Sequence, residues 1–299
     1  MRVEGIQNDD LRVGVIGLGA MGTPMATHLA DAGLLHAVWN RTRSKAEAFA
    51  DGSAVAVADD PAKLASACNV ILTCVSADED LLDVISQMLP SVEPGCVVVD
   101  TSTVSPATAR QVAARLAQRD AGFVDAPVSG GVEGARKGSL SVMVGGDPAN
   151  ISRIMPVLEA ISASVTHMGE VGAGQATKAV NQVMIAGVAE AVCEALALAE
   201  KLNLPSKRLL SVIGAGAAGS WFLQHRGQSM LENEFDVGFK LALLLKDLRI
   251  CQSLAQELNI SIPTVDAAIT DYRELVRLGD GDHDISGLIR LKRGLNGTH

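Results

Sequence analysis

The chain has 299 residues, of which 48% are hydrophobic and 20% charged, a composition that excludes a disordered protein and favours a globular one. Because one hydrophobic core seldom grows beyond ~250–300 residues, we expect two domains. The formal net charge of −9, with lysines and arginines dispersed along the chain, excludes a nucleic-acid-binding protein that depends on a basic surface.

The composition also predicts a cytoplasmic location. The first ten residues, MRVEGIQNDD, are polar and acidic and resemble neither a signal peptide nor a transit peptide. No apolar run is expected to reach the ~18 residues of a membrane span, so no membrane partner is predicted. The five cysteines form no C-x-x-C pair and favour buried, reduced thiols. The sequon at Asn296 has no consequence in a chain that is not secreted.

The first part of the chain alternates strands with helices. The apolar run 11–17 predicts a buried strand, and the helix that follows it ends at Gly33, a residue suited to a C-cap. Strands that alternate with helices form βαβ units around a parallel sheet, so residues 1–172 are expected to form an α/β domain. Further segments are predicted as strands at 36–40, 54–57, 69–75, 96–100 and 122–127, and as helices at about 44–50 and from about 61.

From about residue 170 the pattern changes to helices. Residues 175–203 contain no helix breaker except Gly187 and predict one long, mostly apolar helix, which is expected to be buried. Glycines and prolines divide the rest of the chain into shorter helical segments without a convincing pair of strands. We therefore expect residues 173–299 to form an all-helical domain for substrate binding and dimerisation, with the long helix as the connection.

The first predicted strand runs into a glycine-rich loop, GLGAMG, at residues 17–22. This loop fits the G-x-G-x-x-G pattern of dinucleotide-binding proteins and lies in the required place, between a strand and a helix. The pattern indicates a tight turn at Gly17, close approach of a pyrophosphate at Gly19 and close helix packing at Gly22. Free N–H groups at the helix start suit phosphates, which favours a Rossmann-like domain. The predicted cofactor-binding residues are Gly17, Leu18, Gly19, Ala20, Met21 and Gly22.

The end of the second strand predicts the form of the cofactor. It reads Asn40-Arg41-Thr42-Arg43, followed by Lys45, and has no acid that could accept hydrogen bonds from the ribose 2′-hydroxyl of NAD. Arginine suits a phosphate, whereas the alternative interpretation is a solvated basic loop. At this place in a dinucleotide-binding fold we favour phosphate recognition and therefore NADP.

A second literal match to the glycine pattern, GAGAAG at 214–219, is expected not to bind a dinucleotide. It lies in the helical part, and no strand with a ribose-reading residue follows it. We interpret it as an interhelical turn that ends at Ser220-Trp221. The stretch GDGDHD at 279–284 lacks the closing Glu of a calcium loop and is expected to cap the last helix. No metal site is predicted, because the histidines are not spaced in the sequence as metal ligands are; these are His28, His36, His167 and His225.

Lys178 is the one charged residue between Glu170 and Glu190. It lies among alanine and valine, and two amides, Asn181 and Gln182, follow it one helical turn later. Burial disfavours the charged form of a lysine, so an ammonium in an apolar site can exchange protons near neutral pH. A lysine that extends from the helix to solvent is the alternative, and the helix alone does not decide between the two.

Five stretches occur in one order and at regular spacing: GLGAMGTPMATHLA, VVVDTSTVSP, DAPVSGGVEGARKGSLSVMVGG, GAGQATKAVNQ and FKLALLLKDL. Together they resemble the motif set of the β-hydroxyacid dehydrogenases. That family includes 3-hydroxyisobutyrate dehydrogenase, tartronate semialdehyde reductase and the glyoxylate/succinic semialdehyde reductases. The resemblance runs from about residue 12 to 290 and is more specific than any single motif.

The resemblance implies roles for the matching positions. Lys178 would be the general acid that protonates the carbonyl oxygen of the substrate while NADPH delivers hydride. Thr103 would lie near both nicotinamide and substrate. The family pattern further implies a substrate-carboxylate clamp at Ser129, Gly130 and Gly131, and cofactor contacts at Val75, Ser76 and Lys246. It implies substrate contacts at Phe239 and Asp247. Phe239, Lys246 and Asp247 would close the cleft from the helical domain. It also matches Asp284 and Ser286 to a family position near the last helix.

One position departs from the family pattern. Many members have an asparagine four residues after the lysine, whereas this chain has Gln182 there and Asn181 one position earlier. The K-x-x-N-Q form resembles the tartronate semialdehyde reductase branch, so an amide is retained. Both amides are assigned to the catalytic group, and which of them contacts the substrate is left open.

The sequence thus predicts a homo-oligomeric, NADPH-dependent reductase of a small carboxylate-bearing aldehyde: glyoxylate, succinic semialdehyde or tartronate semialdehyde. The alternative is an NAD(P)-dependent 3-hydroxyisobutyrate-type or other 3-hydroxyacid dehydrogenase. An imine reductase or a non-catalytic cofactor-binding module is less favoured, because both lack the lysine, and a 6-phosphogluconate dehydrogenase would need a larger helical domain. A dimer or tetramer is expected because long apolar interdomain helices often pair across subunits.

Overall fold

A computed structural model describes residues 11–236 and 238–294. The predictions for the first ten residues and for Asn296 lie outside the described residues. The chain divides into two compact units, of which the first ends at Lys178 and the second begins at Ala179. Each unit encloses hydrophobic clusters of its own.

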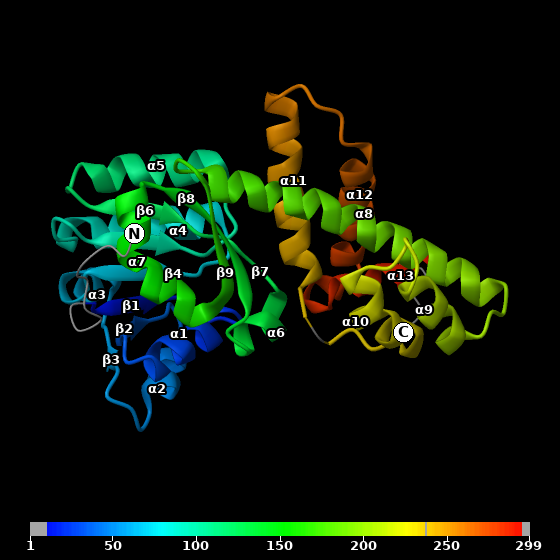
Figure 1. The fold of residues 1–299 in the computed structure, drawn as a ribbon, viewed down its shortest axis with the longest axis horizontal. Helices are drawn as coiled ribbons and strands as arrows, with labels where there is room; N and C mark the ends of the chain where they lie inside the picture. Colours follow the sequence, from blue (N-terminus) through cyan, green and yellow to red (C-terminus); the bar gives the residue numbers. More distant parts are fainter. Residues whose placement is uncertain (1–10, 237, 295–299) are drawn as a thin grey trace. The chain divides into compact units, whose positions relative to one another are not determined.

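The first unit is built on one mixed sheet (Figure 1). Its strands follow the order β3-β2-β1-β4-β5-β6, with every neighbouring pair parallel. This order is that of two mononucleotide-binding halves, and a dinucleotide binds where the order reverses, beyond the ends of β1 and β4. The strands are β1 (Val13–Ile16), β2 (Leu35–Trp39), β3 (Ala56–Val57), β4 (Val70–Thr73), β5 (Val97–Asp100), β6 (Gly122–Asp125), β7 (Val128–Ser129), β8 (Leu140–Gly146) and β9 (Ser162–Gly169).

Helices cover both faces of this sheet (Figure 1). Successive side chains of a strand point to opposite faces, so Val97 and Val99 pack in the cluster with α1 and α7, whereas Val98 packs in the cluster with α3, α4 and α5. A continuous apolar strand is therefore buried on both sides. The helices are α1 (Gly22–Asp31), α2 (Arg43–Ala50), α3 (Pro61–Ala67), α4 (Asp78–Met88), η2 (Leu89–Ser91), α5 (Pro106–Ala117), α6 (Gly131–Arg136) and α7 (Pro148–Ile161).

Three of these helices begin with the same two-residue signal, a capping side chain followed by proline. Asp60, Ser105 and Asp147 each accept hydrogen bonds from backbone N–H groups of the first turn, and a proline occupies the next position. The cap satisfies an N–H group that has no partner inside the helix, and proline has no N–H to satisfy. Each start is therefore determined locally.

The predicted Rossmann-like domain is confirmed, but the sheet extends beyond the predicted strands. β8 pairs antiparallel with β6, and β9 pairs parallel with β8. Neither strand was predicted. β9, SASVTHMG, is largely exposed and mostly small or polar, so it lacks the apolar run by which a buried strand is recognised.

The second unit is helical, as predicted. Its core surrounds Tyr272, which is fully buried and donates its hydroxyl hydrogen bond to the carbonyl of Ile285. The second glycine pattern lies between two helices, and Ser220 caps the later one, which confirms the interhelical turn. The helices are α8 (Ala173–Lys201), which starts in the first unit, α9 (Ser206–Gly214), α10 (Trp221–Glu232), α11 (Leu241–Glu257), α12 (Pro263–Arg277), η3 (Asp280–Asp282), η4 (Ile285–Leu288) and α13 (Ile289–Lys292).

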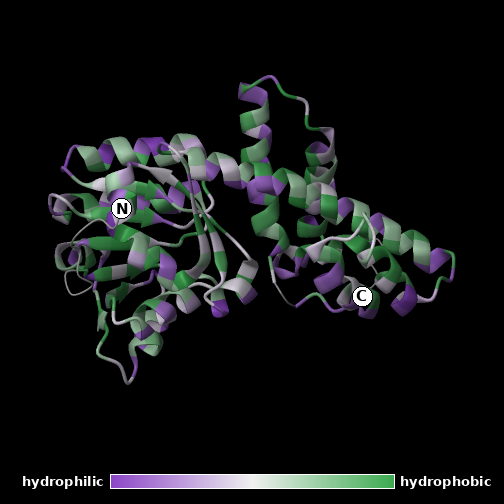
Figure 2. Cartoon of the chain, viewed as in Figure 1, coloured by the Kyte–Doolittle hydropathy of each residue, from purple (hydrophilic) through white to green (hydrophobic). Residues whose placement is uncertain are grey.

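The long helix α8 corrects the expectation that no apolar stretch reaches the length of a membrane span. Its 29 residues contain an 18-residue window that is apolar enough by composition. Half of that window is buried inside the protein, and Ala186, Ala189 and Leu196 lie fully buried in the helical core. Figure 2 shows hydrophobic residues along much of α8. The core helix of a globular protein meets the same compositional test.

Candidate active site

The glycine-rich loop connects β1 to α1 at the carboxyl edge of the sheet. Gly17 has φ +100°, and a Cβ atom there would collide with the carbonyl oxygen of Cys74, which follows β4. A Cβ atom at Gly22 would collide with the carbonyl oxygen of Gly17. At Gly19, by contrast, no described atom lies within 4 Å of such a Cβ. The loop is thus tightly closed on its inner side and open at Gly19, an arrangement that fits a dinucleotide pyrophosphate.

Asn40 ties the loop after β2 to the glycine-rich loop. Its Oδ1 accepts a hydrogen bond from the backbone N–H of Leu18 (2.9 Å), and its Nδ2 donates to the carbonyl of Thr42 (2.9 Å). The two cations beside it differ in their partners. Arg41 pairs with Asp80 and has a side chain that is 82% exposed, whereas Arg43 is held by both Glu47 and Asp59. Arg41 is therefore the more available cation of the two.

A cavity of about 680 Å³ lies against the glycine-rich loop. Its lining includes Leu18, Gly19 and Ala20 of the loop and residues of α1. Lys45 and Arg136 add two cations to the lining, opposed by the carboxylate of Asp31. The charge balance around the loop suits an anionic ligand.

A buried carboxyl group, Asp100, organises the ends of β4 and β5. Its Oδ1 accepts hydrogen bonds from the hydroxyls of Thr73 (2.7 Å) and Ser102 (2.7 Å), and the Ser102 hydroxyl in turn accepts from the backbone N–H of Val75 (2.8 Å). Within residues 11–236 and 238–294 the Oδ2 atom has no hydrogen-bond partner. Burial raises the pKa of Asp100 to about 6, although these hydrogen bonds oppose the shift.

Asp100→Asn is expected to change how stability depends on pH. Because the folded pKa of about 6 exceeds the ordinary value of 3.8, the folded protein binds more protons than the unfolded one between those values. The contribution of Asp100 to stability is therefore present below about pH 4 and is lost as the pH rises to about 6. Relative to the parent, the variant should gain on the order of 3 kcal/mol across this window in urea unfolding. The exposed Asp51→Asn change is the control, and parallel curves for parent and Asp100→Asn would contradict the prediction.

Lys178 lies in the second turn of α8 and is buried, with only 8% of its surface exposed. Its Nζ donates a hydrogen bond to the carbonyl of Val128 (2.9 Å). Val128 directly precedes Ser129, and the glycines that follow have φ +129° and φ +61°, in the left-handed region. Because Lys178 is buried, the alternative of a lysine that extends to solvent is wrong. Because its partner is Val128, the ammonium lies beside the predicted carboxylate clamp, Ser129, Gly130 and Gly131.

Two residues that the sequence did not single out hold the start of α8 in place. Asp125, at the end of β6, accepts hydrogen bonds from the backbone N–H groups of Gly172 (2.7 Å) and Gln175 (2.9 Å). Burial raises the pKa of the Asp125 carboxyl, and these backbone bonds oppose that shift. The side chain of Gln175 contacts the segment after β5. The sequence carries no signal for either residue, because the groups that they contact are backbone atoms far away in the chain.

In the second unit the two predicted amides belong to a buried network. Asn181 Nδ2 donates to Gln182 Oε1 (2.8 Å), and Gln182 Nε2 donates to Asp247 Oδ2 (2.7 Å). Lys246 pairs with the same carboxylate at 3.0 Å. Gln182 is 1% exposed and engages both ends of its amide within the protein, whereas Asn181 is partly exposed.

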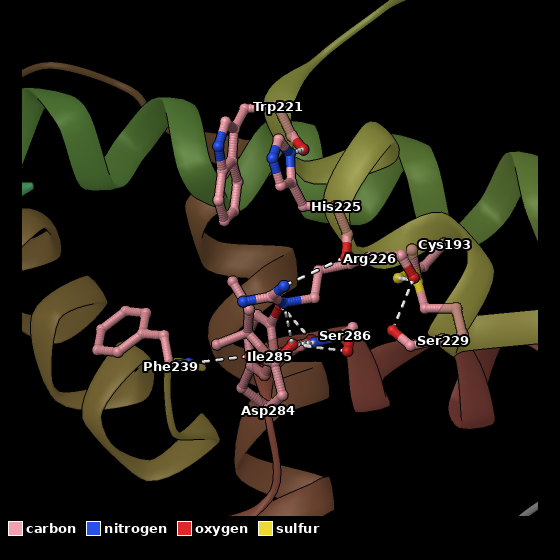
Figure 3. Close-up of polar contacts among 11 residues, drawn as sticks. Cys193, Trp221, His225, Arg226, Ser229, Phe239, Asp284, Ile285 and Ser286 are labelled. Atoms are coloured by element: carbon pink, nitrogen blue, oxygen red, sulfur yellow. Dashed lines mark hydrogen bonds and ion pairs between the residues drawn. The ribbon is translucent and has the colours of Figure 1, made fainter. Parts of the chain in front are cut away.

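Phe239 is held through its backbone by Asp284 (Figure 3). The Asp284 carboxylate accepts from the Phe239 N–H (2.9 Å) and from both the N–H and the hydroxyl of Ser286, and Arg226 lies 3.6 Å away. Asp284 also caps η4, so the stretch does cap a helix, but not the last one as predicted, because the N-cap of α13 is Leu288. Trp221 stacks on His225 with ring centroids 4.2 Å apart beside this group.

The structure thus places the predicted site residues in two groups. Lys178, Thr103 and the residues of the glycine-rich loop and the clamp lie in the first unit. Asn181, Gln182, Phe239, Lys246 and Asp247 lie in the second, and their closure over the cleft stays a prediction. No group of three metal-ligating side chains occurs among the described residues. Four cysteines are buried and Cys74 is partly exposed, all of them as free thiols.

Comparison with known proteins gives two matches to family models. The NAD binding domain of 6-phosphogluconate dehydrogenase matches residues 12–169, and the NAD-binding domain of NADP-dependent 3-hydroxyisobutyrate dehydrogenase matches residues 172–292. Together they span almost all of the described chain.

Individual proteins are similar over nearly their whole length. The 2-hydroxy-3-oxopropionate reductase of Escherichia coli is 33% identical over 94% of this chain and 96% of that protein. The NAD-dependent L-serine dehydrogenase of Pseudomonas aeruginosa is 33% identical over 94% of this chain and 97% of that protein. The solved structure of 3-hydroxyisobutyrate dehydrogenase from Mycobacterium tuberculosis with L-serine has 31% identity and a TM-score of 0.86, covering 95% of this chain and 99% of that one.

Proposed function

Since this chain belongs to the β-hydroxyacid dehydrogenase family of oxidoreductases, we propose that it reduces a small carboxylate-bearing aldehyde with NADPH. The substrates proposed are glyoxylate, succinic semialdehyde or tartronate semialdehyde. One observation carries the proposal: a buried lysine, Lys178, donates to the carbonyl that directly precedes the Ser129 clamp. A proton donor is thereby adjacent to a group suited to a carboxylate.

The residues of this chain would divide the reaction between them. NADPH, when bound, would supply the hydride for the carbonyl carbon. Lys178 would give its proton to the carbonyl oxygen, which completes the alcohol, and a proton from solvent would then restore the lysine. Ser129 and the backbone N–H groups at Gly130 and Gly131 would bind the substrate carboxylate, because their turn leaves N–H groups available to an anion.

The preference for NADP is part of the proposal. No carboxylate occurs at Asn40-Arg41-Thr42-Arg43, where NAD-dependent proteins of this fold have one. Arg41 is the residue proposed to bind the 2′-phosphate, since its guanidinium is exposed, whereas Arg43 already has two carboxylate partners. One similar protein is named as NAD-dependent, so the test compares both cofactors.

Of the two amides, Asn181 is proposed to contact the substrate. Gln182 engages both ends of its amide with Asn181 and Asp247 and is buried, which makes it a support for its neighbour. Asn181 uses only its Nδ2 in that contact, so its carbonyl oxygen is the end available for a hydroxyl or for the Lys178 ammonium one turn earlier.

A homodimer or homotetramer is also proposed, on the apolar face of α8. Val180, Met184 and Leu198 on α8, and Leu202 directly after it, are each more than half exposed. The spacing of four and fourteen residues places the first three on one side of the helix. Large exposed apolar patches mark contact surfaces, and light scattering should return a multiple of the chain mass.

The test of function is the initial rate of NADPH and NADH oxidation with the three aldehydes, a ketoacid and a cyclic imine. The fastest reaction is expected with one of the aldehydes and NADPH. Arg41→Ala should lower the ratio of NADPH to NADH efficiency about 10–100-fold, the worth of a charge-assisted hydrogen bond, whereas Arg43→Ala should lower it less. Turnover of the imine alone would contradict the proposal. Faster oxidation of 3-hydroxyisobutyrate or L-serine than reduction of every aldehyde would also do so.

A further inference from the structure

The side-chain amide of Gln175 brackets Thr103. Gln175 is buried in the first turn of α8, where its Nε2 donates to the carbonyl of Ser102 (2.8 Å) and its Oε1 accepts from the N–H of Val104 (3.2 Å). The amide thus pairs with the main chain on both sides of Thr103, as a neighbouring strand would. Gln175 is 71 residues from Val104 and 73 residues from Ser102 in the sequence.

The backbone of Gln175 is fixed as firmly as its side chain. Its N–H donates to Asp125 Oδ2 (2.9 Å), and the N–H of Gly172 donates to Oδ1 (2.7 Å). The space around this carboxylate is filled by backbone: a Cβ at Gly145 would lie 2.6 Å from Oδ1, and one at Gly174 would lie 2.9 Å from Oδ2. The start of α8 therefore has no room to shift along the end of β6.

Lys178 follows Gln175 by three residues and lies on the neighbouring turn of the same helix face. Its ammonium is held to the Val128 carbonyl at 2.9 Å. One rigid helical turn thus joins the contact that holds Thr103 to the contact that holds the ammonium. A displacement of Gln175 would change the position of both groups relative to each other.

We propose that Gln175 is a positioning residue, whose amide sets the segment carrying Thr103 at a defined distance from Lys178. This inference rests on the proposed role of Lys178 as proton donor. The reacting groups must meet within a few tenths of an ångström, and a misplacement of 1 Å can lower a rate about 100-fold. Gln175 itself does not touch the reacting atoms.

The test compares Gln175→Met, which keeps the length of the side chain without its hydrogen bonds, with Gln175→Glu. Burial favours the protonated form of a glutamate, which can donate to the Ser102 carbonyl and accept from Val104, so this variant should lie between parent and Met. Single-turnover oxidation of NADPH, bound at one equivalent per enzyme and started with saturating aldehyde, is the measurement. We expect the rate constant to fall about 10–100-fold in Gln175→Met, with affinity for NADPH within twofold of the parent. Gln118→Met, at an exposed glutamine, is the matched control and should be unchanged.

Other outcomes decide against the inference. A single-turnover rate constant is independent of how much enzyme is active, whereas the amplitude is not. A smaller amplitude with the parental rate constant in both variants would show that Gln175 only supports the fold and would overturn the proposal. If Lys178→Ala retained parental rates, the proposed function would fail instead. Inactivity of Lys178→Ala together with parental rates in both Gln175 variants would leave that function intact and remove the positioning role.

Discussion

Lys178→Ala is expected to lower kcat for aldehyde reduction by about 10²–10⁴-fold, the range for loss of a general acid. The nitrogen that donates to the Val128 carbonyl, and with it the proposed proton source, would be absent. Binding of NADPH, followed by its fluorescence, should remain within a fewfold of the parent, because the glycine-rich loop is untouched. Lys178→Arg should be almost as inactive, since a guanidinium keeps the charge but releases its proton poorly.

The matched control for this experiment is Lys201→Ala, which removes an exposed lysine from the other end of the same helix. Its kcat should equal that of the parent. A kcat for Lys178→Ala within threefold of the parent would contradict proton donation by Lys178 and would mean that another group donates the proton.

Gly17→Ala and Gly214→Ala are expected to behave in opposite ways, although both glycines open a literal G-x-G-x-x-G pattern. At Gly17 the backbone has φ +100° and the new Cβ would meet the Cys74 carbonyl, so the loop must move. We expect a loss of about 2–4 kcal/mol in unfolding free energy, together with loss of NADPH binding. Gly214 ends α9, and the nearest neighbour of its Cβ is 4.0 Å away.

Alanine at Gly214 should therefore be neutral or should stabilise the protein by up to about 1 kcal/mol, because alanine favours a helix over glycine. Urea unfolding and NADPH titration of the two variants form the test. Equal loss of cofactor affinity in both would mean that the second pattern also contributes to the cofactor site.

The fold could be predicted because its signals are local. Apolar strands buried on both faces, capping residues followed by proline, and the glycine-rich loop after β1 each depend on neighbours within a few positions. β8 was missed because it depends on antiparallel pairing with β6, the last strand of the predicted parallel sheet. β9 was missed because it is largely exposed and polar. Such strands are determined by their partners and not by their own periodicity.

The site was predicted in part, for a similar reason. Lys178 could be recognised because a lone ammonium in an apolar helix is unusual whatever surrounds it. Asp125 and Gln175 could not, since their partners are backbone groups 47 to 73 positions away and any residue type offers a backbone N–H or carbonyl. When a side chain forms hydrogen bonds with the main chain, its partner can be any residue type, so the sequence does not reveal the pair.

The continuity of α8 has a consequence for the construction of chimaeras. The two family models meet between residues 169 and 172, which makes that stretch an obvious place to join halves from different relatives. A junction there would transfer Gln175 and Lys178 with the second half, while Asp125 and the segment on either side of Thr103 stay with the first. Lys178 would then come from one parent of the chimaera, and the groups that orient it would come from the other. The junction of a chimaera of this protein should therefore lie inside α8, beyond Lys178.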